Sequence, residues 1–127
     1  MSFVWTGTFT SEGYEESNGT VSLLLPSDLK TFQNETEVHV AGLIVYTSSY
    51  KTNFRKTLHV VSKDSKTFSG FKGDQPITFV LDFSNPEQIT GTYDMPPPEF
   101  DNGTVLLTKT DSDSLDLSEP QVKCCVM

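Results

Sequence analysis

Short apolar segments at regular spacing constrain the fold of this chain more than any other feature of its sequence. Val, Ile, Thr, Phe and Tyr recur in runs of about four to eight residues, separated by clusters of Gly, Pro, Asn, Asp and Ser. Eight such runs predict strands, at residues 3–10, 20–25, 37–46, 55–62, 67–71, 77–83, 88–93 and 104–109. No segment has a convincing 3.6-residue apolar period, and residues 26–33 are expected to form at most a turn or two of helix.

The short links between the predicted strands indicate an antiparallel meander. Such a meander closes as a barrel or folds into a two-layer sandwich, and the pattern leaves both alternatives open. The 127 residues are enough for one domain with a normal hydrophobic core. We therefore expect an all-β fold of about eight antiparallel strands, followed by a flexible acidic C-terminal tail.

Residues 6–23 and 90–107 resemble each other within the chain, with nine of eighteen aligned positions identical. The offset of 84 residues exceeds half the chain, so this is not a simple tandem duplication. The similarity instead predicts two hairpins of like construction, each with a return strand that begins at Asn-Gly, where glycine tolerates a positive φ. In a closed barrel these hairpins would lie side by side and leave no free sheet edge.

Alternation along the strands predicts which side chains form the core. In residues 37–46 one face carries Val38, Val40 and Ile44, but the opposite face is also mostly apolar, which predicts a strand covered on both sides. Residues 77–83 alternate more cleanly, as in a half-buried strand. Further core candidates are Trp5, Phe9, Tyr93 and Leu107.

Signals of enzymatic chemistry are weak. The chain has no glycine-rich phosphate loop and no nucleophile elbow. His39 and His59 lie beside valines in predicted strands without metal-ligand spacing, so we expect partly buried structural histidines. Asp94, Glu99, Asp101 and Asn102 cluster in one loop and offer oxygen ligands for calcium, but they lack the regular ligand spacing of a known calcium loop. We therefore expect no enzyme activity, no metal and no cofactor.

The charge of the chain is uneven. A net charge of −8 argues against general binding of nucleic acid. Residues 51–72 nevertheless hold six of the nine basic residues and one acid. The candidate basic face, for a membrane or a partner, consists of Lys51, Arg55, Lys56, Lys63, Lys66 and Lys72. Because side chains alternate along a strand, about half of these residues can share a surface. The alternative is a solvated sheet edge protected by lysines.

The two cysteines of the chain lie in its last four residues, Cys124-Cys125-Val126-Met127. This tetrapeptide resembles a CaaX prenylation box, with the modifiable cysteine fourth from the end and Met at the position that favours a farnesyl group. It departs from the usual pattern at Cys125, where an aliphatic residue is typical. The resemblance implies lipidation of Cys124 and covers the tail alone. A frayed tail that happens to contain cysteine is the alternative.

These patterns divide the chain into an antiparallel β-domain at 1–109, an acidic serine-rich tether at 110–123 and the CaaX-like box at 124–127. No apolar run reaches the roughly 20 residues that span a bilayer, and the first residues lack the basic region of a secretory signal. We therefore expect a cytoplasmic protein, peripheral on the cytosolic face of a membrane.

The leading hypothesis is a non-enzymatic binding or scaffolding module, tethered through prenylated Cys124 and acting on an unknown protein partner. One alternative is an intracellular carrier, since an eight-stranded barrel of this size is wide enough to hold one small apolar ligand. Trp5 in a Trp-x-Gly-x-Phe setting resembles lipocalin-like barrels, where the pattern is Gly-x-Trp and this chain has Gly7-Thr8-Phe9. A cavity of several hundred Å³ would favour the carrier, and a core filled by Phe and Leu would exclude it. Another alternative is a structural subunit of a larger assembly, which a large exposed apolar patch would favour.

Overall fold

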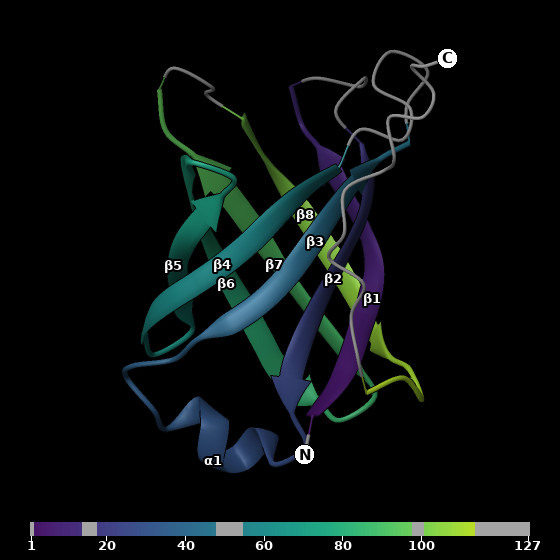
Figure 1. Ribbon diagram of the computed structural model, residues 1–127, viewed down its shortest axis with the longest axis vertical. Coiled ribbons are helices and arrows are strands. Elements are labelled where there is room, and N and C mark those ends of the chain that lie inside the picture. Colours follow the sequence, from purple (N-terminus) through teal and green to yellow (C-terminus); the bar gives the residue numbers. More distant parts are fainter. Residues whose placement is uncertain (1, 14–17, 48–54, 98–100, 114–127) are drawn as a thin grey trace, which may run out of the picture.

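Eight antiparallel strands form a closed barrel in the computed structural model, which describes residues 2–13, 18–47, 55–97 and 101–113 (Figure 1). The strands are β1 (Ser2–Ser11), β2 (Gly19–Pro26), β3 (Val40–Tyr46), β4 (Arg55–Asp64), β5 (Thr67–Lys72), β6 (Gln75–Asn85), β7 (Gln88–Met95) and β8 (Asp101–Lys109), with the helix α1 (Leu29–Gln33) between β2 and β3. Each strand pairs with the next, and β8 pairs with β1. The predicted all-β meander is confirmed, and of its two closures the chain adopts the barrel.

The strand termini define the two ends of the barrel. At the α1 end, β1 begins at Ser2, β2 runs into α1 and β8 finishes at Lys109 (Figure 1). At the opposite end, which we call the loop end, β1 finishes at Ser11 and β8 begins at Asp101.

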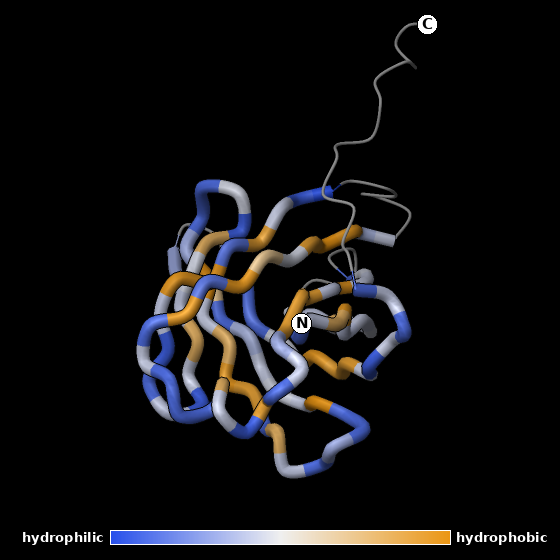
Figure 2. Tube along the Cα trace, turned by 60° about the horizontal axis from the view of Figure 1, so that its bottom comes forward, coloured by the Kyte–Doolittle hydropathy of each residue, from blue (hydrophilic) through white to orange (hydrophobic). Residues whose placement is uncertain are grey.

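Inward-facing apolar side chains fill the barrel. Figure 2 shows that apolar and polar residues alternate along the strands. Phe68, Leu58 and Leu81 are among the largest fully buried side chains. The predicted core residues Trp5, Phe9, Tyr93 and Leu107 are all buried, which confirms them. The second apolar face of β3 lies on the outside of the barrel, where Leu43 is buried and Ala41 and Val45 are partly exposed.

The two similar hairpins have the same register. Phe9 pairs with Gly19 in the β1–β2 hairpin, and Tyr93 pairs with Gly103 in the β7–β8 hairpin. The hairpins lie side by side because β1 pairs with β8, and the rings of Phe9 and Tyr93 meet edge to face with centroids 5.9 Å apart. Their predicted adjacency is confirmed.

The glycines of the two Asn-Gly steps do not have the predicted positive φ. Among the described residues, the positive φ values belong to Ser65 and Gly73. A Cβ atom on Gly19 would lie 2.1 Å from the carbonyl oxygen of Val45, and one on Gly103 would lie 1.9 Å from that of Thr10. These glycines are needed because the backbone of the neighbouring strand approaches too closely for any side chain.

Helix α1 begins at a side-chain cap. The carboxylate of Asp28 accepts hydrogen bonds from the hydroxyl and the N–H of Thr31, at 2.7 and 3.1 Å, and these bonds lower the pKa of Asp28. Phe32 is buried, stacks on Phe68 with ring centroids 5.7 Å apart and meets Phe83 edge to face at 6.2 Å. The helix therefore closes part of one barrel end with an aromatic cluster.

The chain stays attached to the barrel beyond β8. The N–H of Thr110 donates to the carbonyl of Val4, and the N–H of Val4 donates to the carbonyl of Ser112, both at 2.9 Å. The domain boundary predicted after Lys109 thus precedes a short segment that still pairs with β1. The rest of the predicted tether and the CaaX-like box lie outside the described residues. In the described part of the chain, no helix has the length and apolar character needed to cross a membrane.

Candidate functional site

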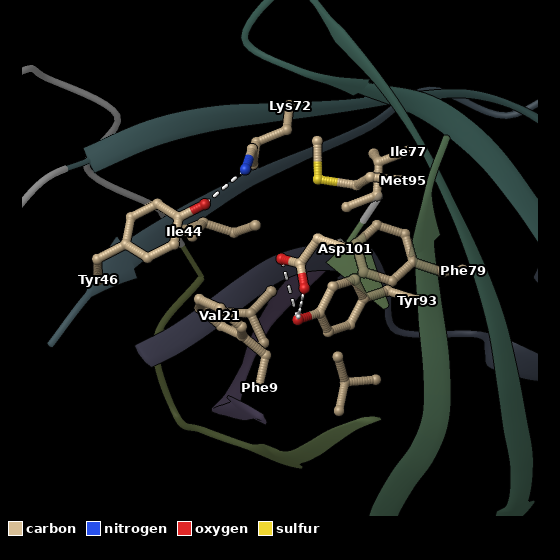
Figure 3. A pocket seen from close by; sticks show the side chains of 11 residues that line it. Phe9, Val21, Ile44, Tyr46, Lys72, Ile77, Phe79, Tyr93, Met95 and Asp101 are labelled. Atoms are coloured by element: carbon tan, nitrogen blue, oxygen red, sulfur yellow. Dashed lines mark hydrogen bonds between the residues drawn. The ribbon is translucent and has the colours of Figure 1, made fainter. Parts of the chain in front are cut away.

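The barrel interior is nearly full. Its cavity toward the loop end has a volume of about 10 Å³ and lies among apolar and aromatic side chains that include Phe9, Phe79 and Met95 (Figure 3). This is room for about one water molecule, whereas a pocket for a drug-sized ligand occupies about 300 Å³ or more. The interior bounded by the described residues therefore does not accommodate an apolar ligand of that size.

Two buried charged side chains face this cavity from different strands. Lys72 on β5 donates a hydrogen bond to the hydroxyl of Tyr46 (Figure 3). Asp101 on β8 accepts a hydrogen bond from the hydroxyl of Ser11 at 2.7 Å and longer ones from the hydroxyl of Tyr93 at 3.4 Å. Among the described residues, every buried side-chain nitrogen or oxygen atom has a hydrogen-bond partner, as the cost of burying polar groups requires.

Tyr93 is held in its neutral form. Burial raises the pKa of its hydroxyl far above the usual range, and the neighbouring Asp101 carboxylate raises it further because a phenolate would face another negative charge. A neutral tyrosine at this position donates to Asp101 and has little capacity to act as a base. Ser11, Tyr93 and Asp101 therefore form a hydrogen-bonded cluster inside the barrel, near the loop end.

The structure separates the six residues of the predicted basic face. Lys51 lies outside the described residues. Arg55 and Lys56 begin β4 at the loop end, whereas Lys66 lies in the turn after β4 at the α1 end. The ten residues of β4 span about 30 Å, so these charges do not form one surface.

Lys63 and Lys72 are 6% and 7% exposed, so the prediction that they belong to a basic face is wrong. A β-bulge between Val60 and Ser62 shifts the alternation of β4, and Lys63 consequently points inward. Its ammonium donates to the carbonyls of Gln33 and Glu35, the latter at 2.9 Å, and so ties the end of α1 to the barrel. Lys72 faces inward with Phe68 on β5.

The histidines also differ from the prediction. His39 and His59 are exposed on the outside of the barrel, with their ring centroids 6.4 Å apart. Outward positions alternate with the buried valines beside them, which explains why flanking valines did not indicate burial. The described residues contain no group of three or more His, Cys, Asp or Glu side chains that could hold a metal ion.

The exposed large apolar side chains are scattered over the barrel wall. Phe71, Val80 and Leu106 lie on β5, β6 and β8, with exposed fractions of 41–44%. Threonines on both neighbouring strands flank Val80 and Leu106. These three residues therefore do not form the continuous patch that would favour a subunit of a larger assembly.

A hollow of about 310 Å³, larger than the cavity inside the barrel, opens beside α1, and we call it the α1 groove. Its lining is partly apolar, from the half-buried Phe3, Leu29 and Phe83 and the buried Trp5, and partly polar, from Ser27, Gln33 and Ser84. Lys109 also lines it, with its ammonium 4.2 Å from the centroid of the Phe3 ring. The volume is at the lower end of the range for small-molecule pockets.

The α1 groove is assembled from distant parts of the sequence, so no local pattern predicted it. β1, β6, β8 and α1 each contribute a wall. The chain leaves the barrel beside it, because Lys109 lines the groove and residues 110–112 pair with Val4, between the groove residues Phe3 and Trp5. The groove therefore lies next to the last described residues of the chain.

No known protein family has a sequence model that matches this chain, and the search of curated proteins also found no match.

Proposed function

We propose that this protein is a non-enzymatic binding or scaffolding module, held on the cytosolic face of a membrane by a prenyl group on Cys124. The sequence Cys124-Cys125-Val126-Met127 carries the proposal, since it places a cysteine and a terminal methionine as a CaaX box requires. The proposal takes Met127 as the carboxyl terminus of the protein in the cell.

The position of the last described residues supports this arrangement. The chain is paired with β1 as far as Ser112, and ten residues, 114–123, separate Asp113 from Cys124. A segment of that length spans at most about 35 Å, so a lipid on Cys124 would keep the barrel close to the bilayer. Because the interior is nearly full, a partner would contact the outer wall or the α1 groove.

Membrane attachment by this route is expected to be reversible. A single prenyl chain gives marginal binding and usually needs a second signal. The described members of the predicted basic face are buried or lie at opposite ends of the barrel, so they do not supply one. We therefore expect the protein to exchange between membrane and cytosol.

The test compares Cys124→Ser with Cys125→Ser, a matched control that keeps the modifiable cysteine. After expression in a eukaryotic cell, the Cys124→Ser protein should be recovered wholly in the soluble fraction, while Cys125→Ser should keep its membrane-bound share. The intact mass of the parent should show a farnesyl group and loss of residues 125–127. Equal membrane recovery of parent and Cys124→Ser, or a bare and untrimmed terminus, would overturn the proposal.

The filled interior excludes a carrier that holds its ligand inside the barrel. A second candidate is a carrier that binds a small apolar ligand in the α1 groove, whose volume is about 310 Å³. Such a carrier would leave its native cell with an apolar compound bound. Organic extraction of the purified native protein, followed by mass spectrometry, should then recover about one such molecule per chain. An empty extract would exclude this candidate.

A further inference from the structure

We infer that the α1 groove is the docking site of this chain's own prenyl group, which it shelters when the protein is away from the membrane. The inference rests on the proposed prenylation of Cys124 and adds a second location for the lipid. A soluble prenylated protein would otherwise expose the hydrocarbon to water, so a sheltering site lowers the free energy of the soluble form.

The course of the chain brings the tether to the groove. Residues 110–112 run along Val4, and the neighbouring residues Phe3 and Trp5 both line the groove. The ten residues that follow Asp113 reach up to about 35 Å, and they start beside Val4, whose neighbours Phe3 and Trp5 line the groove. A short tether also gives its end a high effective concentration at nearby sites.

The chemistry of the groove fits a flexible hydrocarbon with a polar attachment point. The partly exposed Phe3, Leu29 and Phe83 offer aromatic and aliphatic surface, and the hollow of about 310 Å³ is about thirty times larger than the space inside the barrel. Exposed polar residues at its margin, Ser27, Gln33 and Ser84, leave an edge where the cysteine end of the lipid would remain in water. The groove thus offers both apolar and polar surface, which matches the two parts of a prenylated cysteine.

Trp5 makes the groove observable, because it is the single tryptophan of the chain. The full-length Cys124→Ser protein, which carries no lipid of its own, is titrated with S-farnesyl-cysteine methyl ester while the tryptophan emission is recorded. Occupation of the groove should change the emission saturably. An emission that stays unchanged up to the solubility limit of the compound would overturn the inference. A response to oleate without a response to farnesyl-cysteine would mark a fatty-acid site and would overturn it as well.

A charged variant of the groove separates specific binding from adsorption. Leu29→Asp places a carboxylate in the groove lining at the first residue of α1, where the helix dipole favours negative charge. Because Leu29 also packs against the core, urea denaturation of the variant must show that it remains folded under the binding conditions. Leu106→Asp is the matched control, since it makes the same change at an exposed leucine on the barrel wall. The farnesyl-cysteine response should disappear in Leu29→Asp and persist in Leu106→Asp. Equal responses in the two variants would contradict the assignment.

The same pair of variants tests the groove with the lipid attached. Farnesylated protein is mixed with neutral phosphatidylcholine vesicles, and the bound fraction is measured by sedimentation. If the groove holds the lipid for nine-tenths of the time, only one-tenth of the protein has its lipid free to enter a vesicle. Loss of lipid binding by the groove in Leu29→Asp should then raise the apparent vesicle affinity about tenfold relative to Leu106→Asp. Identical vesicle binding would overturn this inference alone, because the protein is prenylated in that experiment. An unprenylated native protein, detected by its intact mass, would overturn both proposals.

Discussion

The two ends of the barrel each contain a buried lysine from the same basic stretch of sequence, but the lysines differ in what they hold. At the loop end, Lys72 bonds to the side-chain hydroxyl of Tyr46 within the barrel. At the α1 end, Lys63 bonds to backbone carbonyls of Gln33 and Glu35 and so fixes α1. The comparison shows that a cluster of positive charge in the sequence can serve the packing of a barrel rather than its surface.

The ends also differ in how completely they are packed. The cavity toward the loop end has a volume of about 10 Å³, while the α1 groove has about 310 Å³. A five-residue helix is about 7.5 Å long, which is too short to cover a whole barrel end. Phe32 seals the side near Phe68 and Phe83, and the groove remains on the side of β1 and β8.

The largest effect is expected from removing the aromatic plug at the α1 end. Phe32→Ala should lower the free energy of unfolding by about 3–5 kcal/mol, because it leaves a cavity beside Phe68. Phe71→Ala, at a side chain that is 44% exposed, should cost less than about 0.5 kcal/mol. Urea denaturation measures both. Similar losses in the two variants would show that α1 does not contribute to the core.

The buried lysines provide a direct comparison of the two ends. Lys63→Met should lower the free energy of unfolding by about 2–3 kcal/mol, because two carbonyls lose a charged donor. Lys72→Met should cost about 1 kcal/mol, because the loss of the hydrogen bond to Tyr46 is partly offset by removing a buried charge. Chemical denaturation of both variants tests this order, and a larger loss for Lys72→Met would reverse our comparison.

The free energy of unfolding should fall in alkali because of Tyr93 at the loop end. The folded-state pKa of Tyr93 is raised above its unfolded value, so its contribution is fully present below about pH 10 and is lost as the pH rises further. One such group gives a slope of at most about 1.4 kcal/mol per pH unit. Denaturation curves measured from pH 9 upward should show a steeper decline in the parent than in Tyr93→Phe. Parallel curves would mean that Tyr93 titrates normally in the folded protein.

The smallest expected effect is at the margin of the α1 groove. Lys109→Met removes the cation–π contact with Phe3 and should cost about 0.5–1 kcal/mol. Lys30→Met, at an exposed position on α1, should change the free energy of unfolding by less than that. Thermal unfolding of the two variants measures the difference. If both melt like the parent, the Phe3 wall does not depend on Lys109.

The sequence by itself determined the strands and their inward faces. Alternation is a local property, so it located eight strands and the buried Trp5, Phe9, Tyr93 and Leu107 without knowledge of the fold. The similarity between residues 6–23 and 90–107 also indicated neighbouring hairpins, because like segments form like hairpins. Prenylation of Cys124 stays a prediction from the sequence.

Only the tertiary structure decided which charges are buried and where a hollow remains. One bulge after Val60 reverses the direction of Lys63, and alternation counted along the sequence does not reveal where an extra residue is inserted. The α1 groove exists because barrel closure brings Phe3, Leu29, Phe83 and Lys109 to the same end. These residues are far apart in the chain, and their proximity depends on strand pairing rather than on any local preference.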